Sequence, residues 1–175
     1  MNKKLEDKLK KKYPELLTRL DKKDPNYSCF DRDGLCIGDG WYELFDRVCR
    51  QIQYYNENPP WVEEKFAWIK KLYLNTLYYP IISMIPVLNE ILHVRIKSFP
   101  DTKHEKIRFR QVKEKFGSMR IYHSPYSRYI SGVLAMAESI SNVICENCGT
   151  TENVTQNYTG WTKTYCNNCR KKLKR

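Results

Sequence analysis

The cysteines near the end of the chain carry the clearest chemical signal. Cys145 and Cys148 form one Cys-x-x-Cys pair, and after seventeen intervening residues Cys166 and Cys169 form a second. Each pair places two thiolates on one side of a tight turn, and two such turns supply the ligands of a tetrahedral metal site. Because four thiolates close the coordination shell, the spacing predicts one structural Zn²⁺ ion held by these cysteines.

Other chemistries of the same four cysteines are less well supported. A redox-active pair would not need a matched second pair. Disulfides need an oxidising compartment, whereas we recognise no secretory signal and expect a cytoplasmic protein. An iron–sulfur cluster stays open, although the paired short spacings favour zinc. The segment between the pairs has few large apolar residues, so a metal ion would replace the missing core.

Three further cysteines complete the odd total of seven: Cys29, Cys36 and Cys49. They could form a second metal site. Their spacing is unspecific, however, and buried free cysteines are common in proteins. We therefore favour three reduced thiols and leave the second site open.

Length and charge limit the classes of function. At 175 residues the chain is expected to form one domain, or one with a small appendage. Its formal charge of +11 predicts attraction to polyanions or to acidic protein surfaces. No apolar run approaches the length of a membrane span. The three histidines are scattered and no nucleophile or phosphate-loop motif is present, so the sequence offers little support for an enzyme.

Apolar residues recur at helical spacing in several segments. The predicted helices are residues 3–20 (with a break at Pro14), 41–56, 61–79, 127–144 and a shorter one from Pro86 to His93. Asp39 precedes the second of these helices, and its carboxylate is suited to cap it. The helix over 127–144 runs directly into Cys145, so the first cysteine turn is expected to be attached to a core helix.

Alternating apolar and polar residues predict three antiparallel strands over 93–99, 105–114 and 118–123. A hairpin turn is expected at 116–118, and a slip in the alternation between Phe109 and Val112 indicates a bulge. The predicted fold class is therefore α+β: a three-stranded antiparallel sheet packed with several helices, followed by a C-terminal four-cysteine zinc ribbon.

One face of the predicted sheet and the C-terminal tail are rich in Lys and Arg. Such a face could follow a phosphate backbone or bind a partner, but an ordinary solvated sheet face also alternates in this way, and we weigh the two interpretations evenly. The candidate binding residues are Arg95, Lys97, Arg108, Arg110, Lys113, Lys115, Arg120, Lys171 and Lys172.

Three motifs in order carry a resemblance to a known family. They are Gly38-Asp-Gly-Trp41, then Val112-Lys-Glu-Lys-Phe-Gly117, then the two Cys-x-x-Cys pairs with Gly160-Trp161 between them. This pattern resembles a family of small proteins of bacteriophages and prophages, over residues 10–56 and 105–170. No activity is established for the family, so the resemblance implies a phage-encoded protein of the infected cell's cytoplasm and transfers no catalytic residues.

The resemblance also implies a domain organisation, in which residues 57–104 are an insertion that includes a helical block. Residues 1–144 would then form the α+β core, and 145–175 the zinc ribbon with its basic tail. The leading functional hypothesis is a non-catalytic zinc-binding phage protein that binds a host factor, such as a defence system, and inhibits or redirects it. The alternative is a zinc-ribbon protein that binds nucleic acid through the basic sheet face and tail. Sequestration of a small anionic signal, or an enzymatic activity, is less favoured.

Overall fold

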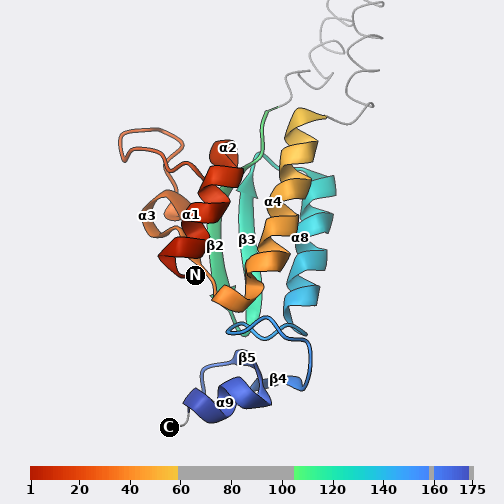
Figure 1. Cartoon of the computed structure of the whole chain (residues 1–175). Helices are drawn as coiled ribbons and strands as arrows, with labels where there is room; N and C mark the ends of the chain where they lie inside the picture. The colour runs from red at the N-terminus through yellow and green to blue at the C-terminus, as the bar shows by residue number, and fades with distance from the viewer. Residues whose placement is uncertain (59–104, 158–159, 174–175) are drawn as a thin grey trace, which may run out of the picture. The chain divides into compact units, whose positions relative to one another are not determined.

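The computed structural model describes residues 1–58, 105–157 and 160–173 (Figure 1). The chain divides into two compact units, Met1–Tyr54 with Lys106–Arg175 and Tyr55–Glu105. The first unit contains both the α+β fold and the four-cysteine segment. The predicted strand over 93–99 and the predicted helices over 61–79 and 86–93 lie outside the described residues, and so does most of the predicted insertion.

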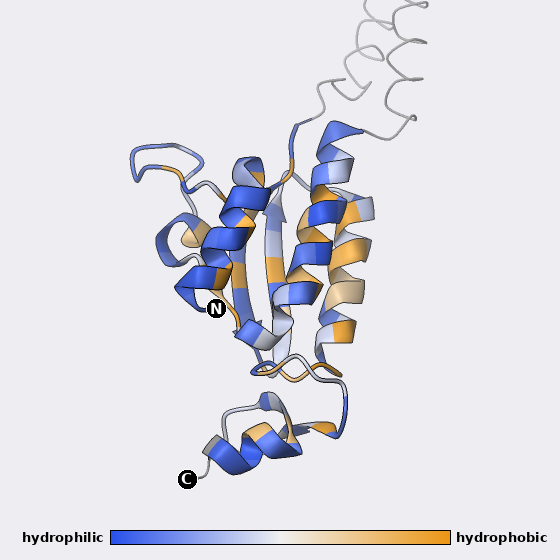
Figure 2. Ribbon diagram, viewed as in Figure 1, coloured by the Kyte–Doolittle hydropathy of each residue, from blue (hydrophilic) through white to orange (hydrophobic). Residues whose placement is uncertain are grey.

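Two short helices open the fold, α1 (Lys3–Lys12) and α2 (Pro14–Leu17). The break predicted at Pro14 is confirmed, because proline lacks the N–H that would continue α1 and instead starts α2. The Asn2 side chain accepts a hydrogen bond from the Leu5 N–H at 3.0 Å and so caps α1. Leu9, Leu16 and Leu17 are buried in the core, whereas the outer surface of α1 is hydrophilic in Figure 2.

A one-turn helix, α3 (Cys29–Asp33), precedes the two-residue strand β1 (Leu35–Cys36). A capping box formed by Ser28 and Asp31 starts α3. The Asp31 carboxylate also accepts the Leu20 N–H at 2.7 Å, which joins the loop after α2 to this helix. Burial alone would raise the pKa of Asp31, but hydrogen bonds from Ser28 and Leu20 hold it below its ordinary value.

The predicted helix over 41–56 is confirmed as a 3₁₀ turn, η1 (Asp39–Trp41), followed by α4 (Tyr42–Glu57). The prediction that Asp39 caps this helix is wrong. Gly38 occupies the capping position without a side-chain bond. The Asp39 carboxylate instead accepts the backbone N–H of Asn2 at 2.6 Å and its side-chain N–H at 2.5 Å, and so holds the start of α1.

The sheet is mixed, so the prediction of an antiparallel three-stranded sheet is wrong. Strand β2 (Arg108–Lys115) pairs antiparallel with β3 (Ser118–Ser124), but β1 pairs parallel with β2, and the order is β1-β2-β3. A strand of two residues shows no alternation, which is why the sequence did not reveal β1. The predicted hairpin turn and bulge are confirmed by positive φ at Phe116 and Gly117 and by a register shift between Phe109 and Gln111.

Aromatic packing on β2 holds the helices against the sheet. The Phe109 ring lies 5.8 Å from the Phe30 ring of α3 and 5.5 Å from the Phe45 ring of α4, measured between ring centroids. Such tilted pairs contribute about 0.5–1.5 kcal/mol each beyond the burial of their area. Phe109 therefore joins α3 and α4 to the centre of the sheet.

Helix α8 (Arg128–Ser141) packs on β3 and corresponds to the helix predicted over 127–144. Ser127 caps it, with its side chain accepting the Ile130 N–H. Ile130 and Leu134 are buried as expected, but Ile140 is exposed, so the apolar residues predicted on one stripe divide between two sides of the helix. None of the helices in the described ranges is long and apolar enough to cross a membrane.

The C-terminal segment forms a small module of its own. Strands β4 (Val154–Asn157) and β5 (Lys163–Cys166) pair antiparallel, and α9 (Asn167–Leu173) follows directly. The basic tail is thus part of the module, because α9 carries Cys169 as well as Arg170, Lys171 and Lys172.

We expect Asp31→Ala to lower the free energy of unfolding by about 1–3 kcal/mol, because it removes a charged acceptor of three hydrogen bonds. The folded-state pKa of Asp31 is depressed, so this contribution is present above the unfolded-state pKa of about 3.9 and is lost as pH falls through the folded value. Urea unfolding at pH 7 and at low pH measures both effects. Asp7→Ala on the exposed side of α1 is the control and should change stability by less than about 0.5 kcal/mol.

Candidate metal centre

The four predicted ligands come together at the junction of α8 and the C-terminal module. The sulfur atoms of Cys145, Cys148, Cys166 and Cys169 all lie within 4.8 Å of one another, and those of Cys148 and Cys166 are 3.7 Å apart. A tetrahedral site with zinc–sulfur bonds of about 2.3 Å has sulfur–sulfur edges of about 3.8 Å. A disulfide would bring two sulfur atoms to about 2.05 Å. The cluster is therefore compatible with a four-sulfur metal site.

Local backbone bonds shape each Cys-x-x-Cys turn. In the first turn, Gly149 N–H donates to the Cys145 carbonyl at 2.9 Å and Cys145 N–H donates to the Thr150 carbonyl at 2.8 Å. Gly149 has φ of +80°, a conformation that favours glycine. In the second turn, Cys169 N–H points at the Cys166 sulfur at 3.4 Å. The Asn147 side chain donates to the Cys169 sulfur at 3.3 Å and acts as an outer partner of the cluster.

Crowding of four thiols makes their ionisation interdependent. The Cys169 N–H and the neighbouring thiols lower the pKa of Cys166 to about 7. The Thr150 N–H favours the Cys148 thiolate, but desolvation and the three neighbouring thiols outweigh it and raise the pKa of Cys148 to about 12. Four thiolates this close repel one another, and a divalent cation is the group that stabilises them together.

The first cysteine turn sits against the loop of the Gly38-Asp-Gly-Trp41 motif. Gly40 N–H donates to the Glu146 carbonyl at 2.8 Å, and the buried Trp41 indole donates to the Ile144 carbonyl at 3.0 Å. A Cβ on Gly40 would lie 2.8 Å from Cys148 N and closer still to the Cys145 carbonyl oxygen and Gly149 N. Only glycine allows the two backbones to approach this closely.

Besides its contact with the Gly38–Trp41 loop, the module contacts the β2–β3 hairpin. Thr164 Oγ1 donates to the Gly117 carbonyl at 2.5 Å. Lys163 Nζ lies 2.7 Å from the Glu114 carboxylate and 3.3 Å from the Glu146 carboxylate. Burial alone would lower the pKa of Lys163, but the two carboxylates raise it, so the amine stays charged between them. The second of the three motifs, Val112–Gly117, is thereby joined to the cysteine module.

The remaining cysteines do not gather. Cys29 and Cys36 are exposed and Cys49 is fully buried. Burial raises the pKa of the Cys49 thiol well above its ordinary value. Across the described part of the chain, the four-cysteine cluster is the only group of Cys, His, Asp or Glu side chains close enough to hold an ion.

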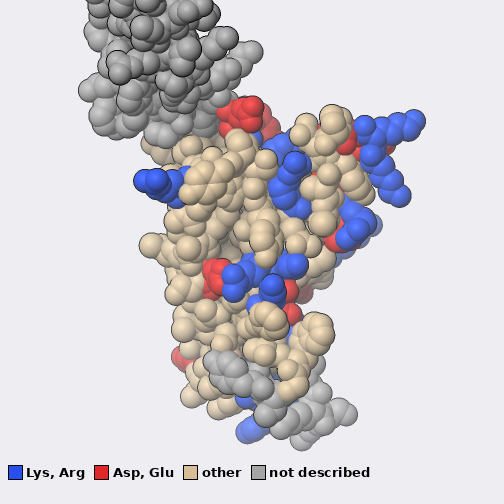
Figure 3. All heavy atoms as spheres, turned by 180° about the vertical axis from the view of Figure 1, so that it is seen from behind, with Lys and Arg blue, Asp and Glu red and all other residues tan. Residues whose placement is uncertain are grey.

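The predicted basic face is divided by contacts within the protein. Arg108 and Arg110 donate to the Thr18 and Asn26 carbonyls, and Arg120 pairs with Glu138 at 2.7 Å. Seen from behind, Lys and Arg lie in separate groups, several of them beside Asp or Glu (Figure 3). Lys113 and Lys115 lie instead over aromatic rings, Lys171 and Lys172 are exposed on α9, and Arg95 and Lys97 are outside the described residues.

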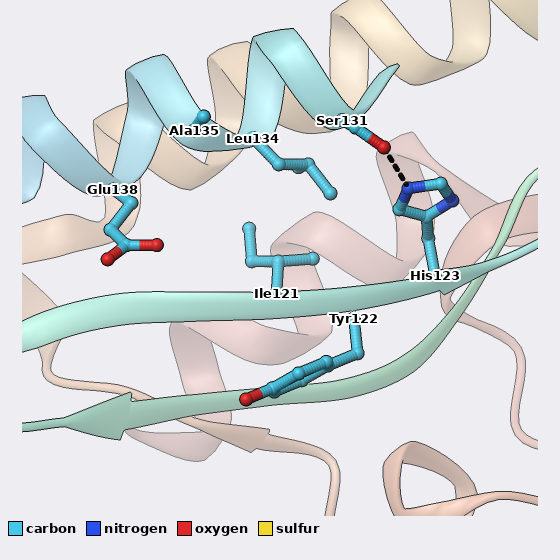
Figure 4. Close-up of a pocket in the computed structure, with 7 residues that line it drawn as sticks. All are labelled: Ile121, Tyr122, His123, Ser131, Leu134, Ala135 and Glu138. Atoms are coloured by element: carbon cyan, nitrogen blue, oxygen red, sulfur yellow. Dashed lines mark hydrogen bonds between the residues drawn. The ribbon is translucent and has the colours of Figure 1, made fainter. Parts of the chain in front are cut away.

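A hollow of about 330 Å³ between β3 and α8 contains a serine–histidine pair that sequence patterns did not reveal (Figure 4). His123 Nε2 lies 3.3 Å from Ser131 Oγ, and His123 Nδ1 lies 2.9 Å from the Pro125 carbonyl. A carbonyl only accepts, so the Nδ1–H of His123 donates to Pro125. The pair joins the end of β3 to the start of α8, and we assign it this tethering role.

Comparisons of the chain with protein-family models, with curated proteins and with solved structures gave no match. The assignment of the site therefore rests on its own residues and geometry. Four sulfur ligands would leave a bound ion no open position, which suits a structural role and not the activation of a water molecule.

We expect the purified protein to contain one zinc ion per chain, and Cys145→Ser to lose it together with several kcal/mol of stability, because the module has little core besides the cluster. Elemental analysis and thermal unfolding, with and without a chelator, measure metal content and stability. Cys36→Ser, at an exposed cysteine away from the cluster, is the control and should keep the ion. A metal-free Cys145→Ser protein that unfolds at the wild-type temperature would contradict a structural site.

We expect Gly40→Ala to lower the free energy of unfolding by more than about 2 kcal/mol, because its methyl group would overlap backbone atoms that cannot move independently. Gly132→Ala is the matched control: a Cβ there meets no atom within 4 Å, and alanine in a helix should stabilise by about 0.5–1 kcal/mol. Urea unfolding of the zinc-loaded proteins compares them. Equal stability of the two variants would exclude the close approach at Gly40.

Proposed function

We propose that this chain is a non-catalytic, zinc-stabilised bacteriophage protein of the host cytoplasm that binds a host protein and inhibits or redirects it. The observation that carries the proposal is an exposed apolar groove between α4 and α8, of about 650 Å³. Pockets of this kind, lined by apolar side chains and few polar groups, are typical binding sites.

The floor of the groove consists of side chains that a helix normally buries. Helix α4 contributes Leu44 and Val48, and α8 contributes Val133, Met136 and Ile140. Met136 is 67 % exposed, although α8 already buries another side against the core. In Figure 2, apolar residues line both helices along their length. Apolar residues grouped on one surface mark a site of interaction.

Gly132 also lines the groove, and its presence there supports the binding of a partner. It stands inside α8, where glycine costs about 1 kcal/mol relative to alanine. A Cβ at this position would meet no atom within 4 Å, so packing within the protein does not require glycine. A partner whose backbone approaches α8 closely would require it.

Charge defines the partner that suits this surface. Both charged residues that line the groove, Arg47 and Arg128, are basic and exposed, and the whole chain carries +11. We therefore commit to an amphipathic helix of a host protein, with apolar residues facing Val48 and Met136 and carboxylates facing the two arginines.

We expect Met136→Glu to weaken binding of the host partner at least about thirty-fold, because it places a charge in the centre of the groove. A tagged copy is used to retrieve the partner from host lysate, crosslinking maps the contact, and titration of the purified pair gives the affinity. The mapped segment should be an acidic amphipathic helix.

Ala135→Glu is the matched control, since it adds the same charge to an exposed position of the same helix that does not line the groove. It should retain the partner. Retention by Met136→Glu would contradict the proposal. A wild-type dimer in light scattering that Met136→Glu dissociates would instead make a second copy of this chain the occupant.

A further inference from the structure

A second exposed site lies where the β2–β3 hairpin meets the C-terminal module. Phe116, at the tip of the hairpin, and Trp161, before β5, line one hollow of about 320 Å³ together with Lys113 and Lys115. The two aromatic residues are 71 % and 81 % exposed. The two rings come from segments more than forty residues apart in sequence. Because both are exposed and neither packs in the core, together they form a candidate surface for interaction.

The acid that lines the hollow, Glu114, is already paired within the protein. The Glu114 carboxylate accepts the Gly117 N–H at 2.7 Å and pairs with Lys163 at 2.7 Å. Burial alone would raise the pKa of Glu114, but these donors hold it below its ordinary value. The negative charge of Glu114 is therefore offset by Lys163.

Lysine side chains supply free positive charge beside the rings. Lys115 Nζ lies 5.4 Å from the Phe116 ring centroid, and Lys113 Nζ lies 5.7 Å from that of Tyr122 on β3. The arginines of the same sheet are held by carbonyls or by Glu138. These two lysines are thus the members of the basic face that the structure places next to exposed aromatic residues.

We propose that this hollow binds single-stranded nucleic acid, with unpaired bases stacking on Phe116 and Trp161 and phosphates contacting Lys113 and Lys115. Proteins that hold single strands without sequence preference combine aromatic platforms with a basic track in this way. A duplex buries its base faces in its own stack and offers none to these rings. The site is separate from the α4–α8 groove and does not depend on a partner there.

The test measures fluorescence anisotropy of labelled oligo(dT) and oligo(U), each about 15 nucleotides long, which spans one such site. We expect Trp161→Ala and Phe116→Ala each to weaken binding about five- to one-hundred-fold. Trp161→Phe keeps an aromatic ring at this position and should retain most of the wild-type affinity. Lys113→Gln with Lys115→Gln should lower the slope of log affinity against log salt by about 1.4, the value for two phosphate contacts on a single strand.

Tyr126→Ala is the matched control, since Tyr126 is an equally exposed aromatic residue that does not line the hollow. It should bind as the wild type does. Zinc content and thermal unfolding show whether each variant is folded. If Trp161→Ala does not fold, the comparison of Trp161→Phe and Phe116→Ala with the wild type still tests the proposal.

Three results would overturn the proposal. The first is no binding of either oligonucleotide at about 50 mM salt, where phosphate contacts are strong. The second is equal affinity for a duplex of the same length, which would indicate charge attraction without stacking. The third is wild-type affinity in both alanine variants at the rings.

Discussion

The close approach of two backbones at Gly40 is the constraint on which this structure depends. The loop before α4 and the first cysteine turn share a hydrogen bond from Gly40 to Glu146, with no room for a side chain between them. Trp41 completes the contact from the next position by donating to the Ile144 carbonyl. This contact joins segments about one hundred residues apart in sequence. A local sequence pattern cannot specify such a long-range contact by itself.

This contact gives the cysteine cluster its role. The module that follows α8 has only a few apolar residues around its cysteines, Val154 and Tyr165 among them. A metal ion would hold the module together internally, while Gly40 and the hairpin hold it against the core. Lys163 extends the same arrangement, because its ammonium group lies between the carboxylates of Glu114 and Glu146. An ion pair of this kind contributes little in exposed positions; burial strengthens the attraction between the charges but adds a desolvation cost.

The rigid framework presents two surfaces of different chemistry. The groove between α4 and α8 is apolar with basic side chains at its edge, and suits an acidic helix. The hollow between the hairpin and the module combines exposed rings with lysines, and suits unpaired bases. The groove is built from side chains on α4 and α8, and the hollow from side chains on the β2–β3 hairpin and on the segment before β5.

Local rules determined much of this protein from its sequence. The Cys-x-x-Cys spacing identified the four clustered residues, because each pair lies within one turn. Helical periodicity located α4 and α8, and Pro14 marked the break between α1 and α2. The hairpin at Phe116–Gly117 and the bulge after Phe109 followed from turn preference and from the slip in alternation.

Only the tertiary structure decided the features that depend on distant partners. Strand β1 is too short to carry a pattern and forms because β2 lies beside it. Asp39 resembled a helix cap, yet its carboxylate holds Asn2. The apolar residues predicted on one side of α8 satisfied one helical period, but packing on β3 buried only some of them and left Ile140 exposed. Sequence period records which residues can share a face, whereas long-range packing selects which of them are covered.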